Sequence, residues 1–203
     1  MTSSAVLVAN GSQPQNEKVL KILTEASKII CIDGGYELIQ KLNMTAQILI
    51  GDLDSIDLSK VKKETKIIRD SDQSTNDLEK ALNHCLNEKI TEISLIGATG
   101  GRDDQNLANI LVAIDFISNL KIENLSDEYS INFSTDTQKF YCEPLTQISL
   151  ISLDKNNIIT TNGLKYDLVE SKLSSSTHGI SNSVLKNEFT ISSKMPLIVF
   201  KKL

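Results

Sequence analysis

The sequence predicts an α/β domain built on a parallel sheet, residues 1–122, followed by an all-β sandwich domain, residues 123–203. Before residue 122, short apolar runs alternate with segments of helical periodicity, which is typical of a parallel sheet covered by helices on both faces. After that point, apolar and polar residues alternate over short segments separated by turn residues such as Asn162-Gly163. This second pattern is typical of antiparallel strands, so the chain changes class near residue 122.

The first half contains five apolar runs that we interpret as strands. They lie at residues 5–9, 29–32, 48–50, 66–68 and 93–96. Helical spacing appears between them, with apolar residues at positions 19, 22, 23 and 26 and again at positions 78, 81, 82, 85 and 86. The segment 106–116 is apolar almost all round, which predicts a deeply packed helix.

Five segments of the second half are interpreted as strands of the sandwich. They lie at residues 129–134, 139–143, 147–153, 187–192 and 197–200. Turn residues separate them, for example at 154–157 and 178–179. Because no helical periodicity appears here, we expect a small antiparallel sandwich.

The composition is that of a globular protein, since 40% of the 203 residues are hydrophobic and 23% are charged. The net charge of −5 gives no electrostatic reason to bind nucleic acid. No apolar run approaches the roughly 18 residues that a membrane span needs, and the first residues lack the pattern of a secretory signal. Cys31, Cys85 and Cys142 are widely separated, which favours free thiols over a disulfide or zinc site. We therefore expect a cytoplasmic protein without nucleic-acid or membrane partners.

Glycines and acidic residues follow each expected strand of the first half. The segments concerned are Asn10-Gly11, Asp33-Gly34-Gly35 and residues 51–55, 70–77 and 97–104. In an open parallel sheet, the carboxyl ends of the strands form the edge where ligands bind. Five such segments at one edge predict a binding crevice there.

Two aspartates of this edge, Asp52 and Asp54, flank a single residue at a strand end. Magnesium prefers a few carboxylates together with water and phosphate oxygens, so this pair suits a metal site, and a solvated loop is the alternative. Asp77 opens an expected helix. There, Ser74 with Asp77, or Asn76 with Glu79, could form a capping box.

The segment GlyAlaThrGlyGlyArg (97–102) can bring backbone N–H groups close to an anion, with Arg102 as a further donor. It matches neither of the common glycine-rich nucleotide motifs, so a plain tight turn is the alternative. Asp33-Gly34-Gly35 permits unusual backbone angles in the same way.

Four blocks of the first half resemble signature sequences of the thiamine pyrophosphokinase family, in the same order. They are AspGlyGly (33–35), GlyAspLeuAspSerIle (51–56), AspGlnSerThrAsnAspLeuGluLysAla (72–81) and GlyAlaThrGlyGlyArgAspAspGln (97–105). In the second half, GlyLeuLysTyrAspLeu (163–168) and SerThrHisGlyIleSerAsn (176–182) resemble that family's thiamine-binding segments. The resemblance implies a Rossmann-like α/β domain followed by a β-sandwich, in a homodimer. It also implies Mg²⁺-dependent transfer of pyrophosphate from ATP to the hydroxyl of thiamine, giving thiamine diphosphate and AMP.

The resemblance also implies roles for individual residues. The magnesium-binding acids are Asp52, Asp54 and Asp77, and the ATP-binding blocks contain Asn76, Thr99, Arg102, Asp104 and Gln105. Asp33 lies in the block near thiamine, while Tyr166, Ser181 and Asn182 match the segment that receives thiamine. The general base stays open between Asp33 and one of the metal-binding acids.

Four residues depart from the family's usual pattern: Asn76, Asp103, Tyr166 and His178. None of them removes an expected metal ligand. Tyr166 replaces a tryptophan of some members, but its ring still offers a face for the cationic thiazolium of thiamine.

Two other functions are compatible with the same residues. An aspartyl-phosphate phosphatase would use Asp52 as its nucleophile, although it would leave the sandwich unexplained. A non-catalytic nucleotide or vitamin sensor would use the same crevice, although it would have no need of an acid cluster suited to magnesium.

Overall fold

The computed structural model describes residues 3–54 and 56–203, so Ser55 of the GlyAspLeuAspSerIle block lies outside the described residues. The chain forms two compact units, Met1–Asp127 and Glu128–Leu203. Each unit is built on its own strands and is described separately.

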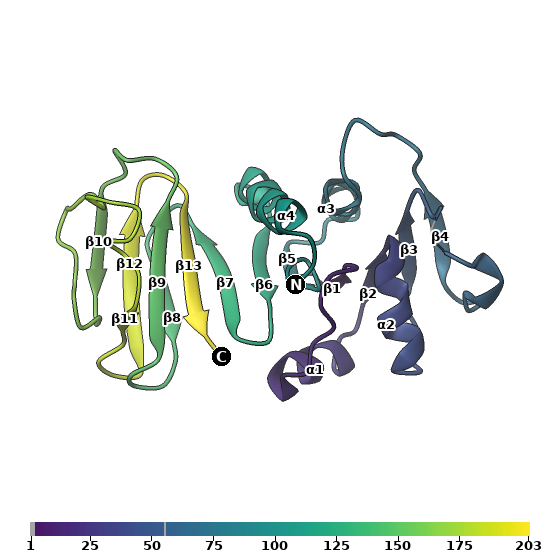
Figure 1. The fold of residues 1–203 in the computed structure, drawn as a ribbon, viewed down its shortest axis with the longest axis horizontal. Helices are drawn as coiled ribbons and strands as arrows, with labels where there is room; N and C mark the ends of the chain where they lie inside the picture. The colour runs from purple at the N-terminus through teal and green to yellow at the C-terminus, as the bar shows by residue number, and fades with distance from the viewer. Residues whose placement is uncertain (1–2, 55) are drawn as a thin grey trace. The chain divides into compact units, whose positions relative to one another are not determined.

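The first unit contains a sheet of parallel strands in the order β6-β5-β1-β2-β3-β4 (Figure 1). The strands are β1 (Ser4–Val8), β2 (Ile29–Ile32), β3 (Ile48–Gly51), β4 (Lys66–Arg69), β5 (Glu92–Ile96) and β6 (Lys121–Leu125). The central strands β1, β2 and β3 are almost wholly buried, as expected for strands covered on both faces. The parallel sheet predicted from the sequence is therefore confirmed, with β6 as a strand that the sequence pattern did not indicate.

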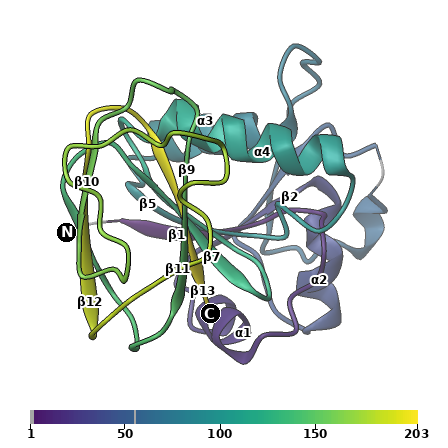
Figure 2. The same ribbon diagram turned by 60° about the vertical axis from the view of Figure 1, so that its left-hand side comes forward.

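Helices cover both faces of this sheet. They are α1 (Glu17–Thr24), α2 (Tyr36–Lys41), α3 (Asp77–Asn87) and α4 (Asp103–Phe116), with short 3-10 turns η1 (Asp33–Gly35) and η2 (Leu58–Lys60). α1 and α2 lie on one face, and α3 and α4 on the other (Figure 2). Right-handed crossovers require this division, because the chain runs outward from β1 to β4 and then returns to β5 on the other side of β1. The direction of winding thus reverses between β1 and β5, where a doubly wound sheet opens a crevice.

Asparagine side chains begin two of these helices. Asn16 Oδ1 accepts a hydrogen bond from Lys18 N, and Asn76 Oδ1 accepts one from Glu79 N at 2.9 Å. Ser74 instead donates to Asp72. Of the two caps considered for α3, the structure therefore contains the one made by Asn76, which leaves Asp77 in the first helical turn.

Helix α4 is a correction to the sequence prediction. Ala113 is the only fully buried residue of this helix, whereas Leu107 is 60% exposed and Leu111 is 39% exposed. A helix on the outside of a sheet presents one side to it, so apolar residues around the rest of its circumference stay accessible. The apolar composition was therefore wrongly interpreted as deep packing.

The second unit contains two antiparallel sheets, in the orders β11-β9-β13-β7 and β10-β12-β8. The strands are β7 (Tyr129–Ser134), β8 (Gln138–Tyr141), β9 (Gln147–Ser152), β10 (Ile159–Asn162), β11 (Asn182–Ser183), β12 (Glu188–Ser193) and β13 (Leu197–Lys202). Side chains of both sheets share a core that includes Ile148, Val199, Phe189 and Ile191. The expected sandwich is confirmed, and β10 and β11 are additional strands.

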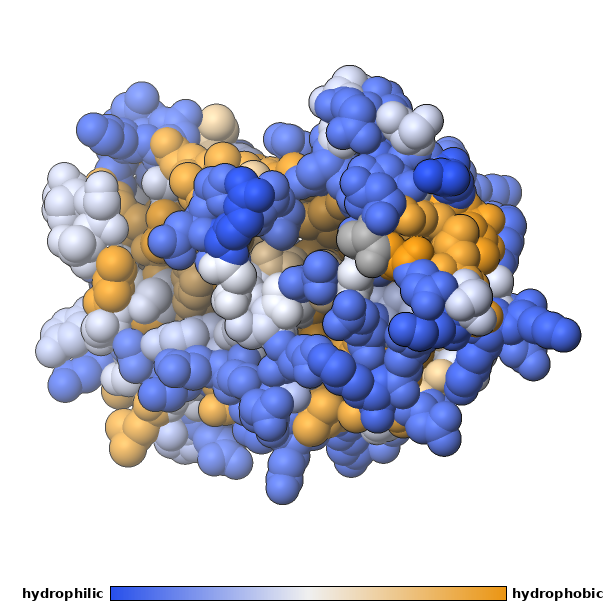
Figure 3. All heavy atoms as spheres, turned by 45° about the vertical axis from the view of Figure 1, so that its right-hand side comes forward, coloured by the Kyte–Doolittle hydropathy of each residue, from blue (hydrophilic) through white to orange (hydrophobic). Residues whose placement is uncertain are grey.

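The three cysteines are free thiols, with Cys31 and Cys85 buried, as the sequence predicted. None of the helices in the described part of the chain has the length and apolar character needed to cross a bilayer. The molecular face in Figure 3 is mostly hydrophilic, with separate apolar patches among polar side chains.

Candidate functional site

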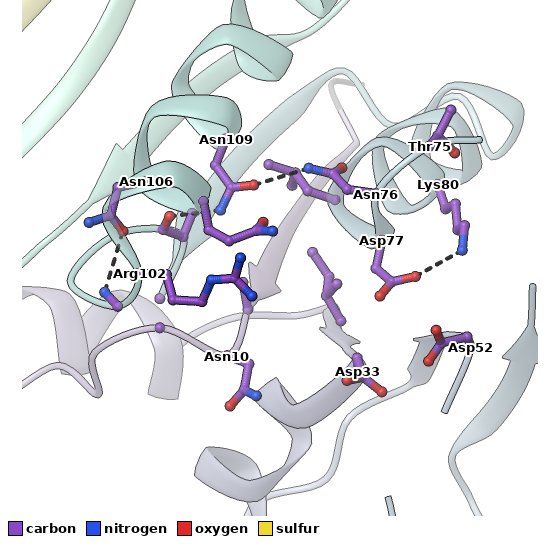
Figure 4. Close-up of a pocket in the computed structure, with 18 of the residues that line it drawn as sticks. Asn10, Asp33, Asp52, Thr75, Asn76, Asp77, Lys80, Arg102, Asn106 and Asn109 are labelled. Carbon is purple, nitrogen blue, oxygen red and sulfur yellow. Dashed lines mark hydrogen bonds and ion pairs between the residues drawn. The ribbon is translucent and has the colours of Figure 1, made fainter. Parts of the chain in front are cut away.

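A cavity of about 600 Å³ lies in the first unit, at the carboxyl edge of its sheet (Figure 4). This volume is within the range typical of small-molecule sites. Its walls come from the segments that follow β1, β2, β3, β4 and β5, from the first turn of α3 and from the first two turns of α4. The cavity therefore occupies the switch point of the sheet, where the sequence predicted a crevice.

One wall consists of two loops in close contact. Gly11 N donates to the Gly97 carbonyl at 2.6 Å, and Ser12 N donates to the Thr99 carbonyl at 3.1 Å. A Cβ atom on Gly11 would lie 2.3 Å from the Gly97 oxygen, so no larger residue fits without a shift. Gly97 and Gly100 adopt φ values of +71° and +84°, which glycine accepts without strain. The glycines thus allow the loops after β1 and β5 to meet over the cavity.

Three carboxylates gather at the opposite side of the cavity, where Asp33 and Asp52 line it and Asp54 adjoins them without lining it. Asp33, Asp52 and Asp54 each offer an oxygen within 4.8 Å of the others. Leu53, between two of these acids, is buried and adopts φ 61°, so its side chain anchors the turn that carries them. Asp33 also adopts a left-handed φ of 41°, a conformation that is uncommon for non-glycine residues.

The carboxylates influence each other's ionisation. The charge of Asp52 raises the pKa of Asp54, with Asp33 and Asp77 contributing in the same direction. The pKa of Asp52 is lowered, chiefly because its carboxylate accepts a hydrogen bond from Asp54 N. A cation between these oxygens would relieve the repulsion, and carboxylate donors suit a hard divalent ion. The residues present therefore fit a site for a hard divalent cation.

Asp77 lies beside this group and faces toward Asp52 (Figure 4). Its Oδ1 is 3.0 Å from Lys80 Nζ, and the same nitrogen donates to the Asp70 carbonyl at 3.0 Å. Lys80 is only 7% exposed, so its charge is held in place rather than moving through solvent. The cluster that meets the geometry of a metal site contains Asp33 together with two of the predicted ligands, while Asp77 adjoins it in an ion pair.

Of the five residues predicted to bind ATP, three line the cavity and two do not. Asn76, Arg102 and Gln105 line the cavity. Arg102 forms a two-armed ion pair with Asp104, through Nε at 3.1 Å and Nη2 at 2.7 Å, which raises the pKa of Arg102 and lowers that of Asp104. Among the described residues, Thr99 and Asp104 do not line the cavity, although Thr99 contacts Ser12 through its backbone.

The residues predicted to bind thiamine in the second unit lie near one another. Asn182 bonds to both sides of the Tyr166 backbone, accepting from its N at 3.1 Å and donating to its carbonyl at 2.8 Å. Tyr166 is 65% exposed, and Lys165 Nζ lies 5.3 Å from the centroid of its ring. Ser181 N donates to Ser149 Oγ. Asn182 therefore has a structural role in presenting Tyr166.

Several lining residues were not predicted as site residues. Asn10, Gln73, Lys80, Asn106 and Asn109 contribute polar side chains to the cavity. Lys80 lies three residues after Asp77 on α3, and Asn109 lies four residues after Gln105 on α4. Asp77 and Gln105 were predicted site residues, so this helical spacing was the available signal, and its use requires the helix boundaries to be known.

The fold and the cavity define a doubly wound α/β protein with an acidic ligand crevice at its switch point and a β-sandwich as its second unit. Two family models match the sequence: thiamin pyrophosphokinase, catalytic domain, over residues 19–124, and thiamin pyrophosphokinase, vitamin B1 binding domain, over residues 128–198. The chain therefore belongs to the thiamin pyrophosphokinase family, whose members are transferases. The resemblance stated from the sequence is confirmed. No curated protein matched the sequence.

Solved structures of this family share the fold over nearly the whole chain. Thiamine pyrophosphokinase from Bacillus subtilis has a TM-score of 0.85 at 24% identity, covering 98% of this chain and 99% of its own. The enzyme from Candida albicans has a TM-score of 0.83 at 17% identity, covering 100% and 89%. The yeast enzyme has a TM-score of 0.80 at 18% identity, covering 99% and 86%. At these identities the likeness establishes the architecture.

Proposed function

We propose that this protein transfers the pyrophosphoryl group of ATP to the hydroxyl of thiamine, producing thiamine diphosphate and AMP. The observation that carries the proposal is the convergence of Asp33, Asp52 and Asp54 within 4.8 Å of one another, with Asp33 and Asp52 lining the switch-point cavity, in a chain that belongs to this family. A polyphosphate and its metal need both a charge-neutralising site and a loop of N–H donors. The acids and the glycine loop supply these from different strands of one sheet.

The acids of the cavity would hold Mg²⁺, with Asp52 and Asp54 as the central pair and Asp33 and Asp77 beside them. When bound, the ion would supply neutralisation of the phosphate charge. The repulsion that raises the pKa of Asp54 supports this assignment, because carboxylates that repel each other gain from a shared cation. Asp77 is held in its position by Lys80.

The glycine loop and Arg102 would orient the triphosphate. Backbone N–H groups of a turn are suitable donors for phosphate oxygens, and the Arg102 guanidinium can bind an oxyanion through two parallel hydrogen bonds. In the structure its two arms are occupied by Asp104. Phosphate binding would therefore exchange one anionic partner of Arg102 for another, at an exposed position where the existing pair contributes little.

The hydroxyl of thiamine must lose its proton when it attacks the β-phosphorus. Asp33 or one of the metal-binding acids would accept that proton at a carboxylate oxygen. Tyr166, Ser181 and Asn182 would contact thiamine, with the exposed Tyr166 ring against the thiazolium cation. Lys165 now occupies that ring face and would have to yield it.

The proposal includes a homodimer located in the cytoplasm. The three free thiols support a reducing compartment. Sedimentation of the purified protein at micromolar concentration tests the dimer, and a mass of one 22.4 kDa chain would contradict it.

The reaction is tested by incubating the purified chain with ATP, MgCl₂ and thiamine and measuring AMP and thiamine diphosphate by chromatography. We expect equal amounts of both products, formed only when all three components are present. Phosphate release without thiamine would indicate the phosphatase instead. Nucleotide binding without any turnover would indicate a sensor, and either result would overturn the proposal.

A further inference from the structure

Asn109, in the second turn of α4, joins two walls of the cavity. Its Nδ2 donates to the Ala98 carbonyl at 2.8 Å, and its Oδ1 accepts a hydrogen bond from Asn76 Nδ2 at 3.3 Å. Figure 4 shows the side chains of Asn109 and Asn76 facing each other, with a hydrogen bond between them. One amide therefore contacts both the glycine loop and the residue that caps α3.

Each contact fixes a segment that has another role in the site. Ala98 lies in the glycine loop and is only 2% exposed, so its carbonyl has little access to solvent as a substitute partner. Asn76 uses its own Oδ1 to cap α3 through Glu79 N, which leaves its Nδ2 for Asn109. The two hydrogen bonds thus connect the loop after β5 to the helix end that carries Asp77.

Loss of these hydrogen bonds would change the backbone conformation of the loop. A buried carbonyl without a donor is costly, so the loop would move to give the Ala98 carbonyl another partner. Gly97 and Gly100, which already adopt left-handed angles, permit such a movement because glycine has access to several backbone conformations. The parallel contact from Gly101 N to Asn106 Oδ1 is long, at 3.3 Å. Of the side-chain contacts that α4 makes with the backbone of this loop, the one from Asn109, at 2.8 Å, is therefore the shorter.

We propose that Asn109 is a positioning residue for the nucleotide: its side-chain amide holds the glycine loop and the N-terminal end of α3 at the spacing that the polyphosphate requires. This inference rests on the proposed function for the identity of the ligand. Asn109 acts through the loop and through Asn76, not by contact with the reacting atoms. Its removal should weaken nucleotide binding and leave thiamine binding unchanged.

The test replaces Asn109 with leucine, which has a similar shape and no hydrogen bonds, and separately with alanine, which favours helix and introduces no steric conflict. Asn83→Leu is the matched control, because Asn83 is an exposed asparagine of α3 that does not line the cavity. The measurements are the KM for ATP, the KM for thiamine, kcat, and calorimetric binding of a nonhydrolysable ATP analogue. Urea unfolding shows that each variant is folded.

We expect the KM for ATP and the dissociation constant of the analogue to rise about tenfold in both Asn109 variants, as the loss of one or two hydrogen bonds implies. The KM for thiamine should stay within about twofold of the original value, and Asn83→Leu should change neither. A fall in kcat and stability with unchanged nucleotide affinity would show a merely structural role and overturn the inference. If the unaltered chain forms no AMP, the proposed function fails, whereas the analogue titration still decides the role of Asn109.

Discussion

Among single residues, Asp54 shows most clearly the electrostatic repulsion between the carboxylates of the site. The carboxylate is exposed, yet the neighbouring charge of Asp52 raises its pKa, and two further aspartates act in the same direction. Exposed groups normally keep ordinary ionisation because water screens their neighbours. The shift of Asp54 therefore reflects how closely the acids approach one another, which is the property that a cation site needs.

Replacing Asp54 with asparagine should weaken magnesium activation by at least about tenfold, since one charged ligand becomes neutral at nearly the same size. The fold should persist, because Asp54 is exposed. The measurement is AMP formation against MgCl₂ concentration, together with calorimetric binding of Mn²⁺ to the ligand-free protein. Asp57→Asn is the control, because Asp57 is a nearby exposed acid that instead bonds to Ser59. Equal metal affinity in the two variants would remove Asp54 from the metal site.

Asn124, on β6, is a second residue whose chemistry conflicts with its surroundings. It is fully buried, and neither atom of its side-chain amide has a hydrogen-bond partner among the described residues. A buried polar group without a partner costs about 1–3 kcal/mol. Asn124→Leu should therefore raise the free energy of unfolding by about 1 kcal/mol or more, measured by urea denaturation.

Asn157 provides the matched control for that substitution. It is equally buried, but its amide donates to the Met195 carbonyl and to Ser152 Oγ and accepts from Met195 N. Asn157→Leu removes satisfied hydrogen bonds and should lower the free energy of unfolding. If both substitutions lower it, Asn124 has a partner, such as a buried water, and the prediction fails.

At the scale of the element, the two loops that meet over the cavity should be sensitive to added bulk. Gly11→Ala would place a Cβ 2.3 Å from the Gly97 oxygen and 2.5 Å from the Thr99 oxygen, so the two loops must separate. Overpacking of this kind costs about 1–3 kcal/mol. We expect that loss in the free energy of unfolding, accompanied by a higher KM for ATP.

Gly101→Ala is the control for this change, because a Cβ there meets nothing closer than the Gly11 Cα at 3.8 Å. That distance is ordinary van der Waals contact, and Gly101 does not adopt a positive φ, so alanine fits its backbone conformation. Its stability should stay within about 0.5 kcal/mol of the original. Equal losses of unfolding free energy in both variants would show that the close contact between the two loops is not the reason why position 11 requires glycine.

The same elements show how far sequence reasoning reaches. β2 was predicted at its observed bounds, and so was β7, because apolar runs and strict alternation are local signals. Asp52 and Asp54 were predicted as metal ligands because they follow a strand, and the structure brings their oxygens close to Asp33. The prediction that α4 is deeply packed was wrong, since the exposure of a helical residue depends on which side of the helix meets the sheet. Asn109 and Lys80 were missed because their contacts join segments that are distant in sequence.

In the whole molecule, the reactivity of the three cysteines measures the unfolding of the two units separately, because the cysteines are divided between them. Cys31 and Cys85 belong to the first unit and are fully buried, whereas Cys142, in the second unit, is partly accessible. Burial raises the pKa of all three thiols, that of Cys85 to about 12. Because the thiolate is the form that reacts, the buried pair is protected by both exclusion and ionisation.

A thiol reagent at pH 8 should therefore modify Cys142 first in the native protein. Cys31 and Cys85 should react only as urea unfolds the first unit, and they should do so together, because β2 and α3 pack in the same core. The measurement is mass spectrometry of digested protein after short labelling at increasing urea concentration. Since each unit has its own core, Cys142 should become fully reactive over its own urea range. If Cys31 or Cys85 reacts as fast as Cys142 without urea, the first unit opens locally and its core does not protect it. If all three instead share one urea midpoint, the two units unfold as one.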